Sequence, residues 1–268
     1  MGATMTAPAI PTPSGIGCLP VRRVPALRPL RWLALGWRDF RHVPGPGLLH
    51  GLLVAAAGLA TLALGQSNPY LLVGAFSGFV LVGPILVTGL YELSRLLSRG
   101  GRPGLADAIH AWRRGTRPLV ALGLLLGAAG TLWVLLSAGL FALFVTEPIV
   151  GLKSFLRYAV QVQGHGLFAL WLAGGALLAA VVFATTVVSP PLLLGRVVAL
   201  RCAILTSVRA VGENPVAMGL WAVVIMAATA LSIATWMLGF VIAIPVLGHA
   251  TWHAYRDLVD TSSAPLRF

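Results

Sequence analysis

Six apolar runs, each near the length that crosses a lipid bilayer, constrain this chain more than any other feature. A helix of roughly 20 apolar residues spans the hydrocarbon core, and only 10% of the 268 residues are charged. The predicted spans are Leu48–Gln66, Tyr70–Tyr91, Leu119–Val145, Leu167–Val188, Val216–Leu238 and Phe240–Tyr255. The last run is short, which leaves a half-helix or a shallow position open. These runs predict an all-α, polytopic membrane protein with about six transmembrane helices.

The spans divide the chain into one membrane domain and two tails. We expect the transmembrane helical domain over residues 31–260. Residues 1–30, rich in proline and small residues near their start, predict a disordered cytoplasmic tail, and 261–268 form a short C-terminal tail. The chain does not begin with the basic-then-apolar order of a signal peptide, so no cleavage is expected there.

The arginines fix the expected topology. They cluster before the first span, between the second and third, between the fourth and fifth, and after the last, whereas only Lys153 and Arg157 fall on the opposite side. Basic residues mark the cytoplasmic side of a membrane, which predicts that both termini are cytoplasmic. This distribution, rather than a nucleic-acid partner, explains the net charge of +12. Basic segments at the membrane surface also attract anionic lipids, and Arg95, Arg201 and Arg256 are the expected surface residues.

A pattern of two spans recurs along the chain. Residues Gly78–Leu97 and Gly239–Leu258 are identical at seven of twenty positions, and the matches include Pro84 with Pro245 and Arg95 with Arg256. A weaker copy runs through Pro190 and Arg201. All copies would run from outside to inside, so they predict three parallel two-helix repeats related by an axis along the membrane normal. Short amphipathic helices are expected between hairpins, at Glu147–His165 on the outer face and Leu192–Val211 on the inner face.

Each copy carries a proline at a matching position. Pro84, Pro190 and Pro245 would break the helix and free the carbonyls of Val80, Thr186 and Val241. Broken helices at matching positions of repeats are typical of a transporter site. A packing kink, with the freed carbonyls satisfied by neighbouring helices, is the alternative.

A polar face recurs near the inner ends of two copies. His249 and His253 are four residues apart and align with Thr88 and Glu92. A Glu92–His253 pair would form a gate that titrates near neutral pH, and a structural role at the membrane surface is the alternative. His249 and His253 could also ligate a metal or haem together with His42 or His50, but nothing in the spacing requires these residues, so we predict no metal and no cofactor.

Four strings resemble a bacterial family of integral membrane proteins, DUF2189. They are Gly36–Asp39 followed by Pro44, GPILVTGLYELSR at Gly83–Arg95, Asn214–Pro215, and PVLGHATWHAYRDLV at Pro245–Val259. The resemblance covers residues 30–260 and implies a multi-pass protein of the bacterial inner membrane. The family has no established activity, so no catalytic residue follows from the resemblance.

Two functions remain open from the sequence. The chain contains no Walker loop, no HExxH and no Ser–His–Asp signature, so we expect no enzyme. The first hypothesis is a channel or transporter for a small solute, ion or lipid, with its site between the proline-bearing spans. The alternative is a non-catalytic accessory or assembly subunit of a membrane complex, such as a respiratory complex. Under either hypothesis the protein could form a homo-oligomer or bind a partner in a membrane complex.

Overall fold

The computed structural model describes residues 18–67, 87–144 and 165–267, and its regular structure there is helical. The labelled helices are α1 (Arg28–His42), α2 (Pro44–Ser67), α4 (Leu105–Arg113), α5 (Arg117–Phe144), α7 (His165–Thr186), α8 (Ser189–Gly195), α9 (Leu200–Glu213), α10 (Pro215–Ala234) and α11 (Phe240–Leu258). Residues 87–97 are also helical. The all-α expectation is therefore confirmed for the described residues.

Four of the described helices are long and apolar enough to cross a membrane. Their apolar windows are Pro44–Thr61, Arg117–Ser137, Ala169–Gly195 and Pro215–Ala234, which match the first, third, fourth and fifth predicted spans. Most of the second predicted span falls in residues 68–86, outside the described part of the chain. The sixth, α11, is helical throughout but is not among the four, so the count of six spans is not confirmed.

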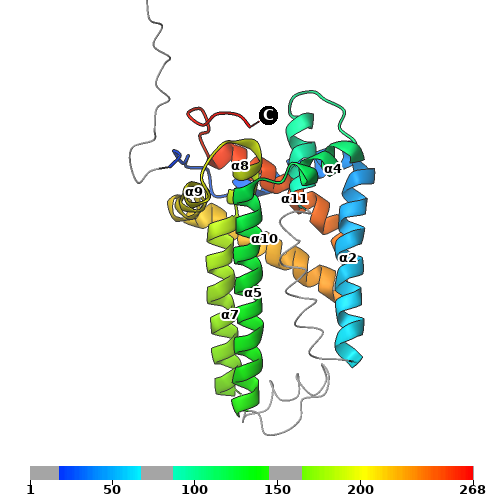
Figure 1. The fold of residues 1–268 in the computed structure, drawn as a ribbon, viewed down its shortest axis with the longest axis vertical. Helices are drawn as coiled ribbons and strands as arrows, with labels where there is room; N and C mark the ends of the chain where they lie inside the picture. The colour runs from blue at the N-terminus through cyan, green and yellow to red at the C-terminus, as the bar shows by residue number, and fades with distance from the viewer. Residues whose placement is uncertain (1–17, 68–86, 145–164, 268) are drawn as a thin grey trace, which may run out of the picture.

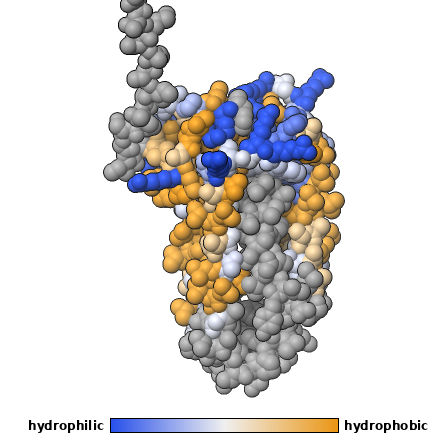
Figure 2. All heavy atoms as spheres, viewed as in Figure 1, coloured by the Kyte–Doolittle hydropathy of each residue, from blue (hydrophilic) through white to orange (hydrophobic). Residues whose placement is uncertain are grey.

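The long helices descend from one polar end of the molecule. In Figure 1, α2, α5 and α7 run along the long axis, while α1, α4, α8, α9 and the C-terminal segment gather at its upper end. We call this region the polar end. Figure 2 shows hydrophilic residues there and apolar residues along the sides below it. Side chains such as Leu124 and Leu177 are more than half exposed, as expected of helices that face lipid.

Glycines let α11 pack closely on α1 and α2. A Cβ added to Gly36 of α1 would lie 2.5 Å from the carbonyl oxygen of Val246, and one added to Gly51 of α2 would collide with the carbonyl of Val241. Val241 precedes Pro245 by four residues, so its carbonyl lacks the usual helical donor. The missing side chain of Gly51 therefore brings α2 directly against the proline-disturbed turn of α11.

The α10–α11 hairpin does not extend along the whole of α2. Its turn contains Met237, which lies beside Gly58, well before the end of α2 at Ser67. By contrast, α5 and α7 lie side by side, with the Trp133 ring against Gly174 and Gly175. Most of the second limb of the first hairpin, residues 70–86, lies outside the described part of the chain. The threefold repeat is therefore not confirmed.

Candidate functional site

Four polar side chains, three of them buried and the fourth, His253, partly exposed, come together where α1, the helical segment 87–97 and α11 meet. Asp39 Oδ2 lies 2.9 Å from Ser94 Oγ and 2.8 Å from His253 Nε2. Ser94 Oγ also lies 2.7 Å from His249 Nδ1. We call Asp39, Ser94, His249 and His253 the Asp39 cluster. Their hydrogen bonds join three helical segments that are far apart in the sequence.

Local sequence explains why these side chains converge. The buried residues of α1 are Pro29, Trp32, Gly36, Asp39 and Phe40, a spacing that places Asp39 on the apolar face of an amphipathic helix. One turn earlier, Gly36 removes the side chain that would hold α1 away from α11. His249 and His253 are four residues apart, so they lie on the same face of α11. This face carries the two side chains that contact Asp39 and Ser94.

The hydrogen-bond directions give the cluster an internal order. Ser94 donates its one hydroxyl proton to Asp39, so it accepts from a protonated Nδ1 of His249. In the neutral imidazole, Nε2 of His249 then carries a lone pair. This atom is buried and has no hydrogen-bond partner among the described residues. The chain of groups thus runs from His253, whose side chain is 13% exposed, through Asp39 and Ser94 to the fully buried His249.

Asp39 stays ionised although only 2% of the residue is exposed. Burial acts on its pKa most strongly and would raise it. Hydrogen bonds from His253 and Ser94, together with the charges of His253 and His249, nevertheless bring the pKa of Asp39 below its ordinary value of 3.8. Arg38 adds an outer ion pair at 3.5 Å. The cluster therefore supplies a buried carboxylate that is matched by donors on two other helical segments.

The residue types are those of a serine hydrolase, but their connections differ. In a catalytic triad the carboxylate orients the histidine, and the histidine takes the proton of the serine. Here the serine donates directly to Asp39. Ser94 and His249 are both 0% exposed, so neither side chain faces solvent in this structure. The Ser–His–Asp combination that the sequence did not suggest therefore occurs, in an arrangement that suits proton exchange better than nucleophilic attack.

The predicted Glu92–His253 pair is wrong. Glu92 forms a two-pronged ion pair with Arg95 instead, with Arg95 Nε 2.6 Å from Glu92 Oε2. The carboxylate that faces His253 belongs to Asp39. The three residues Glu92, Arg95 and Thr88 are all nearly buried on the segment 87–97.

The structure describes two of the three predicted helix-break prolines. Pro245 lies inside α11, whereas Pro190 stands at the start of α8, after the break that ends α7 at Thr186. Pro84 lies outside the described residues, as does the outer amphipathic segment Glu147–His165. The inner amphipathic segment consists of two helices, α8 and α9, joined by 196–199.

A third buried histidine lies near the cluster. His50 Nδ1 is 2.7 Å from the Pro46 carbonyl, and its ring centre is 5.1 Å from that of Trp112. A Cβ on Gly89 would approach His50 Nε2 to 2.6 Å. No group of three His, Cys, Asp or Glu residues with metal-binding geometry occurs within the described ranges.

A basic pocket opens beside the Asp39 cluster at the polar end. It has a volume of about 440 Å³, and its lining includes the five arginines Arg22, Arg95, Arg99, Arg196 and Arg256. We call it the arginine pocket. It brings together Arg95 and Arg256, the matched arginines of the two repeat copies, but Arg201 lies outside it on α9.

Sequence reasoning missed Asp39, Ser94 and the clamp made by Asn214. Asn214 accepts a hydrogen bond from Val24 N at 2.8 Å and donates to the Arg22 carbonyl at 3.1 Å, so it holds the N-terminal segment in place. The usable signal was an acidic residue on the apolar face of an amphipathic helix, at Asp39. The strings that carry the family resemblance contain all five of Asp39, Ser94, Asn214, His249 and His253.

Comparisons with known proteins identify a family and nothing closer. The chain matches no curated protein and no solved structure. One family model matches residues 71–195, a range that contains Ser94 and Glu92 but not Asp39, His249 or His253. The match confirms the resemblance predicted from the sequence. Residues 71–195 match the model of DUF2189, a family of predicted integral membrane proteins.

Proposed function

We propose that the protein is a channel or transporter for a small solute or ion, and that the Asp39 cluster exchanges a proton during the transport cycle. The observation that carries the proposal is the hydrogen-bonded chain from His253 to the buried His249, because ionisable groups held inside a membrane protein commonly mark ion and proton paths. The proposed location is the bacterial inner membrane with both termini in the cytoplasm, which puts the polar end inside.

The cluster is also suited to couple protonation to helix movement. Asp39 accepts hydrogen bonds from Ser94 and His253, which belong to two different helical segments. Protonation of the carboxylate would weaken both bonds, since charge-assisted bonds are about twice as strong as neutral ones. The cytoplasmic ends of α1, α11 and the segment 87–97 would then be free to separate.

Proteoliposomes that contain the pH dye pyranine would test the proposal. Gradients of potassium, chloride, phosphate or ammonium are imposed in turn, and movement of protons into or out of the lumen is recorded. We expect at least one gradient to drive proton movement in the wild-type protein and not in Asp39→Asn. Absence of proton movement with every gradient would count against the proposal.

The control is Arg209→Gln, which removes a partly exposed ion pair with Glu213 on α9. It should insert and transport as the wild-type protein does. Equal loss in Asp39→Asn and Arg209→Gln would point to general damage. An accessory or assembly role predicts instead that a second protein co-purifies in a fixed ratio after mild solubilisation.

A further inference from the structure

The arginine pocket gathers charge from four separate parts of the chain. Arg22 precedes α1, Arg95 and Arg99 lie in and just after the segment 87–97, Arg196 follows α8, and Arg256 lies in the last turn of α11. Like charges repel, so a fold that concentrates arginines in one hollow needs a compensating anion.

The protein supplies only part of that compensation. Asp260 pairs with Arg22 at 3.2 Å, and Glu92 pairs with Arg95. Arg99, Arg196 and Arg256 have no ion pair within the described part of the chain. Arg196 donates to the Ala264 carbonyl at 2.7 Å, which positions it without neutralising it. Three positive charges therefore remain available around the pocket.

The rim of the pocket is held in place by short backbone pairings. Arg22 N donates to the Leu258 carbonyl at 2.8 Å, and Asp260 N donates to the Pro20 carbonyl at 2.9 Å. On the other side, Val197 N donates to the Pro265 carbonyl at 3.1 Å. Donors fixed before a ligand arrives lose less freedom on binding, so these pairings favour a defined site over a diffuse basic surface.

We propose that the arginine pocket binds a phosphate group, carried either by an anionic phospholipid headgroup or by a free phosphate. The planar guanidinium forks of Arg99, Arg196 and Arg256 suit phosphate oxygens, which they can bind in pairs. The volume of about 440 Å³ accommodates a phosphate ester as well as the bare ion. The Trp252 and Tyr255 rings, 5.3 Å apart, provide an apolar wall for the organic part of an ester.

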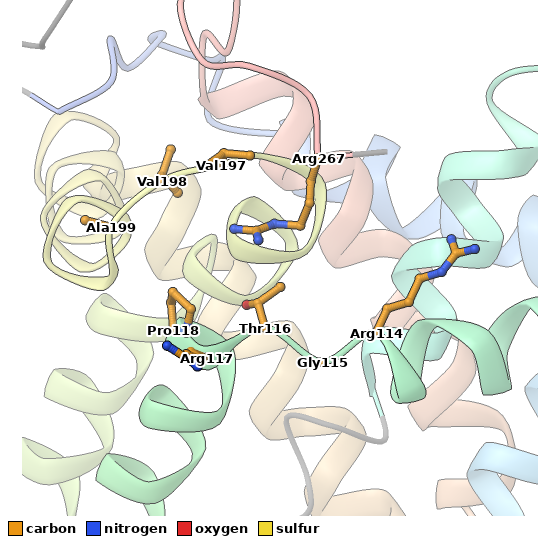
Figure 3. Close-up of a pocket in the computed structure, with 9 residues that line it drawn as sticks. All are labelled: Arg114, Gly115, Thr116, Arg117, Pro118, Val197, Val198, Ala199 and Arg267. Carbon is orange, nitrogen blue, oxygen red and sulfur yellow. The ribbon is translucent and has the colours of Figure 1, made fainter.

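A second hollow at the polar end has a different lining. It has a volume of about 560 Å³ and is lined in part by Arg114, Arg117 and Arg267. Figure 3 shows that the guanidinium groups of these three residues point in different directions. The guanidinium group of Arg267 donates two hydrogen bonds to the Arg196 carbonyl, from Nε at 3.2 Å and from Nη2 at 3.1 Å. The phosphate site is therefore assigned to the arginine pocket alone.

Thermal unfolding of the purified full chain in neutral detergent would test the assignment. The probes are inorganic phosphate against chloride at equal ionic strength, and phosphatidylglycerol against phosphatidylcholine. We expect phosphatidylglycerol, inorganic phosphate or both to raise the melting temperature of the wild-type protein. A response to phosphatidylglycerol alone identifies a lipid headgroup, and a response to inorganic phosphate identifies the free ion as sufficient.

Two double variants separate the pocket from the general charge of the polar end. Arg99→Gln with Arg256→Gln removes two pocket charges, and Arg113→Gln with Arg201→Gln removes two exposed charges elsewhere. The pocket variant should bind the effective probe at least about tenfold more weakly, since each hydrogen bond to a charged group is worth roughly that factor or more, whereas the control variant should bind within about twofold of the wild type.

Two results would overturn the assignment. They are an equal loss of binding in both double variants, and no response of the wild-type protein to either probe. Neither result depends on transport. A failure of the phosphate-site proposal would therefore leave the proposed transport function untouched, and the reverse also holds.

Discussion

At the scale of single residues, the hydroxyl of Ser94 is the central connection of the buried cluster. It donates to Asp39 and accepts from His249, so one small side chain links α1 to α11 through a third helical segment. A buried carboxylate is costly unless donors surround it. Ser94 and His253 supply those donors, and His253 also brings the network toward the surface.

Replacing Ser94 with alanine should therefore destabilise the fold. The variant leaves a buried carboxylate with one donor fewer, and we expect the free energy of unfolding to fall by about 2 kcal/mol. Unfolding by sodium dodecyl sulfate, followed by circular dichroism, measures the change. Ser98→Ala serves as the control, because Ser98 is exposed and its hydroxyl bonds, among the described residues, to the nearby Arg95 carbonyl. Equal stability of Ser94→Ala and the wild-type protein would show that these hydrogen bonds do not contribute to the free energy of unfolding.

The lowered pKa of Asp39 predicts an acid dependence of stability. A carboxyl group with a lower pKa in the folded state stabilises the fold above its unfolded pKa and loses this contribution as the pH falls through the folded value. Stability should therefore fall below about pH 3.8. The fall should be shallower in Asp39→Asn, which has no proton to take up there. Melting temperatures between pH 2.5 and 7, roughly the range over which such a group titrates, would check this, and superimposable profiles would contradict it.

At the scale of helices, contact between backbones decides where α11 sits. Gly36 and Gly51 each lack the side chain that would hold α1 or α2 away from it. The Val241 carbonyl, left without its usual donor by Pro245, lies against Gly51. For Pro245 the structure thus favours a packing kink over an opening to a cavity.

A methyl group at Gly51 should force α2 and α11 apart. We expect Gly51→Ala to lower the free energy of unfolding by about 3 kcal/mol, because its Cβ meets backbone atoms that cannot yield. Gly45→Ala in the same helix has open space around its Cβ and should be neutral or slightly stabilising. Denaturant titration of the two variants side by side measures the difference. If Gly51→Ala leaves the free energy of unfolding unchanged, α2 and α11 are not in close contact.

The sequence predicted helices better than it predicted which helices meet. Hydropathy located α2, α5, α7 and α10 because lipid demands long apolar runs. It could not pair Asp39 with His253, since that contact depends on how α1 packs on α11. The repeat alignment matched Glu92 with His253 and so suggested that they pair. Glu92 instead forms an ion pair with Arg95, which lies three residues away on the same helix. Residues 18–30, expected as part of a disordered tail, include the buried Leu19 and Pro29, and Arg22 N donates to the Leu258 carbonyl.

At the scale of the whole molecule, charge and apolar surface are separated along the long axis (Figure 2). The described end of the N-terminal segment and the C-terminal segment both lie at the polar end (Figure 1). This arrangement agrees with the positive-inside rule, which would place the polar end in the cytoplasm.

Cysteine labelling in a background with Cys18→Ser and Cys202→Ser would test the orientation. Gly166→Cys, exposed at the start of α7, should react with an impermeant maleimide in intact spheroplasts. Arg113→Cys, exposed at the polar end, should react only after the membrane is permeabilised. The reverse pattern would place the polar end outside.

The pairing of the N-terminal segment with the end of α11 has a consequence for biosynthesis. Backbone groups of Pro20 and Arg22 pair with Leu258 and Asp260, which are translated only after helices α1 to α10. The early helices can insert in order of synthesis, but the rim of the arginine pocket closes only after α11 has been made. A polypeptide that stops before α11 ends would leave the backbone of Pro20 and Arg22 without these two partners.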